Sequence, residues 1–145
     1  MSSTSNELLS GCLFFTANSL ARTITRIAEE EFGRIGLVPS HAFLLMQAYD
    51  DPGISQKVLA EKLHLAQSTV SRFVDALVLR GFLEKKAHGK MSYIYPTDKV
   101  KEQLDEIYRA WKKIYQRYSA VLGEEEGQTL TRLANEAHMK LEETS

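Results

Sequence analysis

Hydrophobic residues recur at helical spacing along most of the chain, and the clearest case lies near its middle. Five apolar positions there follow the i, i+3, i+4, i+7, i+8 spacing of one helix face: Val70, Phe73, Val74, Leu77 and Val78. Gly81 follows at the point where a helix favours a left-handed residue, and Arg80 beside it suits the negative end of the helix dipole. The pattern predicts a helix that ends at Gly81 and has a polar outer face.

A shorter helix precedes this one. Val58, Leu59 and Leu63 share a face, Ala60 is a small contact residue, and the Ser55 hydroxyl can cap the start. Only three residues, with His64 first, separate it from the longer helix. This spacing predicts a helix-turn-helix.

After Gly81 the period of the apolar positions changes from 3.6 to 2. Residues 82–86 and 91–95 each have the alternation of a strand, and residues 87–90 join them, with Gly89 able to take a positive φ. Two helices followed by a hairpin predict a winged helix-turn-helix at about residues 39–95. Such a domain presents the start of its second helix to DNA base edges and phosphates. The residues expected to contact DNA are Ser55, Gln67, Ser68, Thr69, Ser71, Arg72, Lys85, Lys86, His88 and Lys90.

Long apolar stripes flank this segment. The first, on a helix at about residues 6–35, comprises Leu8, Cys12, Phe15, Leu20, Ile24, Ile27, Ala28 and Phe32. A second helix starts at Pro39, so four helices are expected before the wing. Beyond the wing, Thr97 is the expected N-cap of a long helix, Gly123 breaks it, and a last helix continues to about residue 142. Tyrosines and Trp111 lie on this stripe.

The flanking helices at about 6–35 and 97–142 offer more apolar surface than one small domain can cover. A two-fold homodimer would bury it and would place two recognition helices one helical turn of DNA apart. The alternative is a monomer whose long helices fold back on themselves. The expected fold is therefore mainly α with a small β-hairpin wing, one domain over residues 1–145, with dimerisation helices at both ends.

The charge distribution supports a nucleic-acid partner. The chain of 145 residues has a net charge of −1, but residues 55–95 carry seven basic and three acidic side chains. A nearly neutral protein can bind DNA when its cations face one way. The alternative is that these lysines form an ordinary solvated face.

The run from Leu59 to Leu83, with Ser-Thr-Val-Ser-Arg at residues 68–72 and Arg-Gly-Phe at residues 80–82, resembles the core of the multiple antibiotic resistance regulator (MarR) family. The resemblance implies a homodimeric repressor that binds a pseudo-palindromic operator in double-stranded DNA and is released by a small-molecule effector or an oxidant. Two departures are visible. The wing lacks the arginine of the family's Asp-x-Arg element, and His64 and Ala66 replace the usual glycine and hydroxyl cap.

Other chemistry is sparse. The resemblance implies a redox sensor at Cys12, since some members carry a reactive cysteine in the first helix, whereas its apolar neighbours favour simple packing. The tyrosines and Trp111 can line an effector pocket or pack in the core. No metal-ligand spacing, cofactor motif, catalytic motif or membrane-length apolar run is present, so we expect neither an enzyme nor a membrane protein. A single cysteine indicates the cytoplasm. The competing function is a winged-helix protein-interaction module that does not bind DNA.

Overall fold

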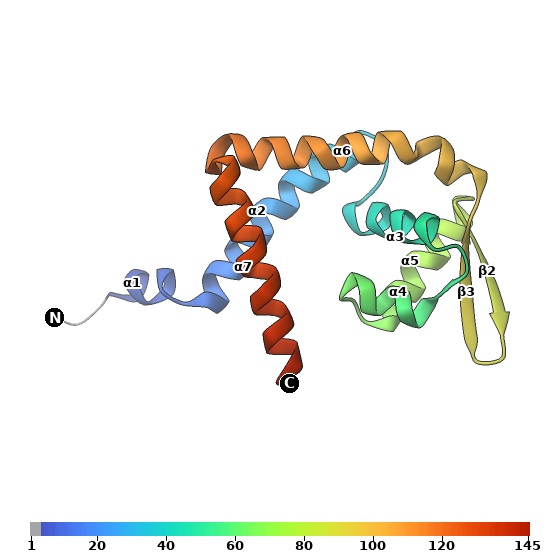
Figure 1. The fold of residues 1–145 in the computed structure, drawn as a ribbon, viewed down its shortest axis with the longest axis horizontal. Coiled ribbons are helices and arrows are strands. Elements are labelled where there is room, and N and C mark those ends of the chain that lie inside the picture. The colour runs from blue at the N-terminus through green and yellow to red at the C-terminus, as the bar shows by residue number, and fades with distance from the viewer. Residues whose placement is uncertain (1–3) are drawn as a thin grey trace. The chain divides into compact units, whose positions relative to one another are not determined.

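A computed structural model describes residues 4–145, which form seven helices and three short strands (Figure 1). The helices are α1 (Ser5–Ser10), α2 (Leu13–Gly33), α3 (Pro39–Asp50), α4 (Gln56–Leu63), α5 (Gln67–Leu79), α6 (Asp98–Leu122) and α7 (Glu124–Glu143). The strands are β1 (Ile54–Ser55), β2 (Leu83–His88) and β3 (Met91–Pro96). The predicted fold class, mainly α with a small β wing, is confirmed.

The first apolar stripe is divided between two helices, so the prediction of one long helix at residues 6–35 was wrong. Thr4 and Glu7 form a capping box that starts α1, and the helix ends at Gly11. A new helix begins when the Cys12 carbonyl accepts the backbone N–H of Thr16 at 2.9 Å and its hydroxyl at 3.0 Å. Five helices rather than four therefore precede the wing. The break lies at Gly11, where a glycine favours the end of a helix, but the apolar spacing continues across it and so gave no signal.

The helix-turn-helix follows its local signals closely. The Ser55 hydroxyl accepts the Val58 N–H at 3.2 Å, which confirms the predicted cap of α4. His64 ends that helix in the left-handed conformation with φ of 56°, and the Leu65 N–H closes back onto the Ala60 carbonyl at 3.0 Å. At the end of α5, Gly81 has φ of 81°. These closures fix the short connection between α4 and α5.

The wing belongs to a three-stranded antiparallel sheet in the order β1-β3-β2, whereas only its hairpin was predicted. The missed strand is two residues long and pairs Ile54 with Ile94. The hairpin turn is also tighter than predicted, because residues 87 and 88 lie in β2 and His88 pairs with Met91. Gly89, with φ of 63°, supplies the positive φ of a two-residue turn.

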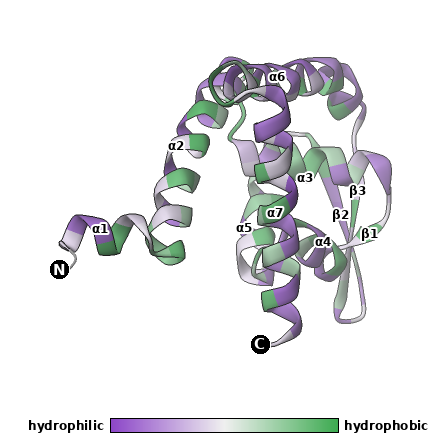
Figure 2. Cartoon of the chain, turned by 60° about the vertical axis from the view of Figure 1, so that its left-hand side comes forward, coloured by the Kyte–Doolittle hydropathy of each residue, from purple (hydrophilic) through white to green (hydrophobic). Residues whose placement is uncertain are grey.

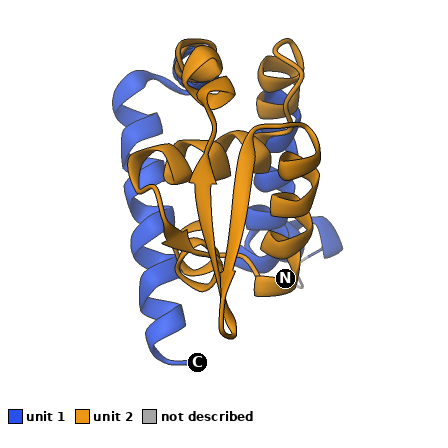
Figure 3. Cartoon of the chain, turned by 90° about the vertical axis from the view of Figure 1, so that its right-hand side faces the viewer, with its two compact units in different colours: residues 1–27, 111–145 blue, residues 28–110 orange. Residues whose placement is uncertain are grey.

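The hydrophobic core lies in the compact unit formed by residues 28–110 (Figure 3). Its largest fully buried side chains are Phe32, Phe82, Leu44, Leu45, Leu59, Leu77, Leu83, Ile94, Ile107, Val70, Val74 and Val100. They come from every helix and from the strands of this unit. The winged helix-turn-helix is therefore held by a core of its own.

The second unit comprises residues 1–27 and 111–145, and its packing is different (Figure 3). Within the described part of this unit no apolar side chain is buried, although hydrophobic residues recur along α1, α2 and α7 (Figure 2). Polar and aromatic contacts join the end of α6 to α7. Tyr115 donates to Glu124 at 3.2 Å, and the Tyr118 ring lies 3.5 Å from the position of a Cβ on Gly127.

Thr97 lies directly before α6, at the predicted N-cap position, and its hydroxyl makes contacts outside α6. It donates to the carbonyl oxygen of Gly81 at 2.6 Å, with the carbonyl oxygen of Phe82 at 3.1 Å. The predicted break at Gly123, where φ is 93°, is confirmed.

Candidate nucleic-acid interface

The outer face of α5 carries the polar residues that the sequence analysis selected. Gln67, Ser68 and Arg72 are exposed, and Thr69 and Ser71 are half-buried. They occupy the first two turns, on the side opposite the buried Val70 and Val74. Burial of the apolar face thus fixes which side chains a partner meets.

The start of α5 leaves backbone donors available. Ala66 makes no side-chain cap, and the first backbone bond of the helix is the one from the Val70 N–H to the Ala66 carbonyl at 3.1 Å. The N–H groups of residues 67–69 precede that bond and point out of the helix end. Such groups at the positive end of a helix dipole suit a phosphate oxygen.

His41 of α3 supports α5 from behind. Its ring meets the Phe73 ring at 4.9 Å between centroids, with an angle of 65° between the planes. Burial lowers the pKa of His41 below its usual 6.5, and the positive charge of Arg80 lowers it further. The neutral imidazole is therefore favoured behind α5.

Two of the wing lysines have partners within the protein. Lys85 of β2 donates to the Asp75 carboxylate of α5 at 2.7 Å, and Lys86 lies 4.7 Å from the centroid of the Tyr95 ring. Lys85 thus neutralises the carboxylate on the outer face of α5. Sequence spacing gave no signal for this pair, because ten residues and a change of secondary structure separate its members.

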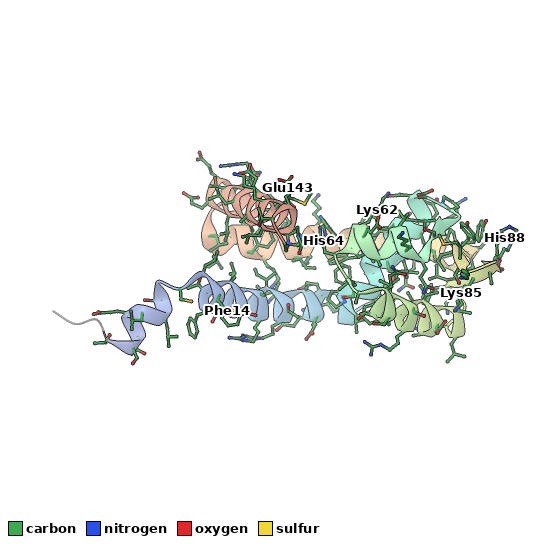
Figure 4. The ribbon with its side chains drawn as sticks, turned by 90° about the horizontal axis from the view of Figure 1, so that it is seen from below. Phe14, Lys62, His64, Lys85, His88 and Glu143 are labelled. Carbon is green, nitrogen blue, oxygen red and sulfur yellow. The ribbon has the colours of Figure 1, made fainter. Side chains whose placement is uncertain are left out.

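His88 and Lys90 lie at the tip of the wing, and both are exposed (Figure 4, where His88 is labelled). His88 is the last residue of β2, and Lys90 follows Gly89 in the turn. The tip offers one ammonium group and one imidazole, and none of its residues is an arginine.

Ser55 occupies a different position from the other selected residues. Its side chain caps α4, and only 8% of the residue is exposed, so its hydroxyl faces the protein rather than a ligand. Conversely, Lys57 and Lys62 of α4 are exposed but were not selected individually. The first helix of a helix-turn-helix crosses the DNA backbone, and this rule could have selected them.

Cys12 is an exposed free thiol in the junction between α1 and α2, so it does not lie within the first helix as expected. Its backbone carbonyl accepts the Thr16 N–H and hydroxyl at the start of α2. The neighbouring Leu9, Leu13 and Phe14 are exposed as well. Its role remains a prediction.

The aromatic residues of α6 are less buried than a core role requires. Trp111 and Tyr108 are each close to half-exposed, and Tyr115 packs edge-on against Tyr118 at 5.5 Å between ring centroids. The expectation that Trp111 packs in the core was therefore wrong for the single chain.

Two further properties of residues 4–145 bear on function. Within residues 4–145, no three side chains of the His, Cys, Asp and Glu types gather closely enough to hold a metal ion. In the same range, no helix combines the length and the apolar character needed to cross a membrane.

A polar, uncapped helix start beside a basic β-hairpin defines a winged helix-turn-helix protein. A sequence model of the MarR family matches residues 37–89, which span α3 to the wing. The chain is 25% identical over 126 residues to the HTH-type transcriptional regulator YybA of Bacillus subtilis, covering 85% of this chain and 84% of that protein.

Solved structures show the same fold. A MarR protein from Peptoclostridium difficile superimposes with a TM-score of 0.78 at 20% identity, over 91% of this chain and 88% of that one. The PcaV transcriptional regulator of Streptomyces coelicolor, in complex with its natural ligand, gives 0.74 at 21% identity over 95% and 97%. The segment from α3 to the wing tip is thus similar in sequence to the MarR family of transcriptional regulators, and the chain shares their fold.

Proposed function

We propose that this chain is a dimeric, sequence-specific DNA-binding regulator whose recognition helix is α5. One observation carries the proposal: the exposed first two turns of α5 present neutral polar groups, free backbone donors and Arg72. The helix has a single carboxylate, Asp75, and Lys85 neutralises it. A surface of this kind suits base edges and phosphates in a major groove.

The wing and α4 extend this surface. Lys90 and His88 at the hairpin tip, and Lys57 and Lys62 on α4, are exposed groups that suit phosphate contacts. Because the wing tip lacks an arginine, we infer that it contacts the sugar-phosphate backbone and that sequence is read by α5.

A second copy of the chain is the proposed partner of residues 4–27 and 111–145. This unit buries no apolar side chain of its own, while Phe14 is 79% exposed and Val121 is 85% exposed (Figure 4, where Phe14 is labelled). Exposed apolar surface on this scale marks an interaction site. A two-fold dimer covers it and presents two α5 helices, which matches a pseudo-palindromic operator.

The proposed output is repression that an effector relieves. A relative with 21% identity, PcaV, has been solved with its natural ligand, which supports a small-molecule effector for this chain. An oxidant acting at Cys12 is the second candidate trigger, favoured by the exposure of that thiol.

Selection from a pool of random DNA duplexes tests the proposal. We expect enrichment of a sequence with two inverted half-sites whose centres lie about one helical turn apart, bound by one dimer. Failure to enrich any sequence would favour a winged-helix protein-interaction module. The variant Arg72→Ala should lose the enrichment, and Lys140→Ala, which removes an exposed cation from α7, should keep it.

A further inference from the structure

The end of α5 is held by the start of α6 through three consecutive carbonyl groups. Lys99 donates to the Arg80 carbonyl at 2.7 Å, the Thr97 hydroxyl donates to the Gly81 carbonyl at 2.6 Å, and the Thr97 N–H donates to the Phe82 carbonyl at 2.9 Å. We call these contacts between residues 80–82 and 97–99 the α5–α6 clasp.

The clasp fits the chemistry of a helix end. The last carbonyls of a helix lack donor partners within it and carry partial negative charge, so a hydroxyl and an ammonium group stabilise them. The backbone after α5 already closes the end of this helix, because the Phe82 N–H donates to the Leu77 carbonyl at 2.9 Å. The hydrogen-bond donors of residues 97–99 therefore link α5 to α6, and α5 does not need them to complete its own end.

A buried aromatic ring orders the same place. Phe82 is 1% exposed, and its ring lies beneath two cations, with Lys99 at 4.5 Å and the Arg80 guanidinium at 5.1 Å from its centroid. At these distances the negative face of the ring attracts and stabilises both cations. The Lys99 ammonium is thus held by both a carbonyl and a ring, which limits its rotation.

The first turns of α6 are anchored in the unit that carries α5. Val100 and Ile107 are fully buried in its core, and Gln103 donates to the Ile35 carbonyl at 2.8 Å. Beyond this anchored part, α6 continues as one helix to Leu122. Any change in direction at the start of α6 is therefore passed to the end of α5.

We propose that Thr97 and Lys99 are positioning residues that lock the recognition helix to α6 and so set which half-site spacing the dimer accepts. The inference rests on the proposed function, because it presumes a dimer that reads two half-sites. With the clasp intact, the two α5 helices keep one separation, and operators of other spacings bind weakly. With the clasp loosened, α5 can reorient and the separation becomes tolerant.

The test compares the affinity for the selected operator with the affinities for altered operators. In these, the spacer between the two half-sites is longer or shorter by one or two base pairs. Thr97→Val and Lys99→Met remove the two side-chain donors and keep the bulk of each side chain. We expect the ratio of affinities between correct and altered spacing to fall about five-fold or more in the double variant, as the loss of these two hydrogen bonds allows. Thr97→Ser keeps the hydroxyl that Thr97→Val removes, so it should keep the native ratio.

Lys101→Met is the matched control, since Lys101 is an exposed lysine two residues further along α6. An unchanged ratio in the clasp variants, or an equal fall in Lys101→Met, would overturn the inference. If the double variant does not fold, Lys99→Met alone decides by the same criterion. Native protein that binds DNA with no spacing preference would overturn only the inference, whereas native protein that binds no DNA would overturn the proposed function.

Discussion

Lys85 of the wing and Asp75 of α5 form an ion pair at 2.7 Å, so the two elements that we propose to face DNA are joined to each other (Figure 4, where Lys85 is labelled). The Lys85 side chain is one-third exposed and that of Asp75 is more exposed, so water screens the pair and its stabilising effect is at most about 1 kcal/mol. Its main consequence is electrostatic, because it removes a negative charge from the outer face of α5.

Asp75→Asn should therefore strengthen binding to random duplex DNA. The substitution removes a carboxylate from the proposed interface and releases Lys85 for a phosphate, so the slope of log affinity against log salt should steepen by about 0.9. Fluorescence anisotropy at several salt concentrations measures both effects. Asp105→Asn, which removes an exposed carboxylate from α6, should leave the slope unchanged. Weaker binding by Asp75→Asn would show that the ion pair itself shapes the interface.

Arg72→Ala should weaken binding to the selected operator by about 1–3 kcal/mol, the range for a lost arginine contact to a base or phosphate. The fold should be unaffected, since Arg72 is exposed on the outer face of α5. Titration of labelled operator, with circular dichroism as the folding check, makes the measurement. A folded variant of native affinity would remove Arg72 from the interface.

Phe14→Glu should weaken the dimer. Burial of a phenylalanine is worth about 1.5–3 kcal/mol, and two copies are affected, so the dimer dissociation constant should rise at least about a hundred-fold. Sedimentation velocity at micromolar concentration gives the readout. Gln116→Glu adds the same charge at an exposed polar position of α6 and should remain dimeric. Equal behaviour of the two variants would place the dimer interface elsewhere.

Organic hydroperoxide should not release the native protein from its operator. A neighbouring cation favours a reactive thiolate, whereas the neighbours of Cys12 in the chain, Leu9, Leu13 and Phe14, are apolar, and the proposed dimer covers them. Gel-shift assays before and after treatment test this expectation. Release that Cys12→Ser abolishes would instead make the protein an oxidant sensor.

Mild acid should destabilise the native protein more than the His41→Gln variant. Because the pKa of His41 is lowered in the folded state, the unfolded chain takes up the proton first as the pH falls below about 6.5. The stability that the neutral imidazole contributes is therefore present above pH 6.5 and is lost as the pH falls through the lowered pKa. Urea unfolding at pH 7.5 and 5.5 provides the comparison. An equal loss in both proteins would exclude His41 as the cause.

Sequence reasoning succeeded where the controlling interactions are local. The glycines at positions 81 and 89 and the inner face of α5 each follow from neighbouring residues. It failed where distant segments meet. The Thr97 hydroxyl donates to the Gly81 carbonyl, a contact across 16 residues that no local pattern indicates. The strand at Ile54 exists only because Ile94 lies beside it.

The candidate site shows the same division. The outward residues of α5 could be chosen from helical spacing, whereas the commitment of Lys85 to Asp75 depends on how β2 packs against α5. Ser55 was correctly expected to cap α4, but its exposure could not be obtained from the sequence, because burial depends on the sheet that forms around it.

The most direct test of DNA binding is a salt titration of the native protein against random duplex DNA. Several phosphate contacts should give a linear loss of log affinity with log salt, with a slope of about −0.9 for each contact, and Arg72→Ala should reduce the slope by about one contact. Absence of binding at low salt, or binding that does not depend on salt, would contradict the assignment of α5 and the wing as a DNA-binding surface.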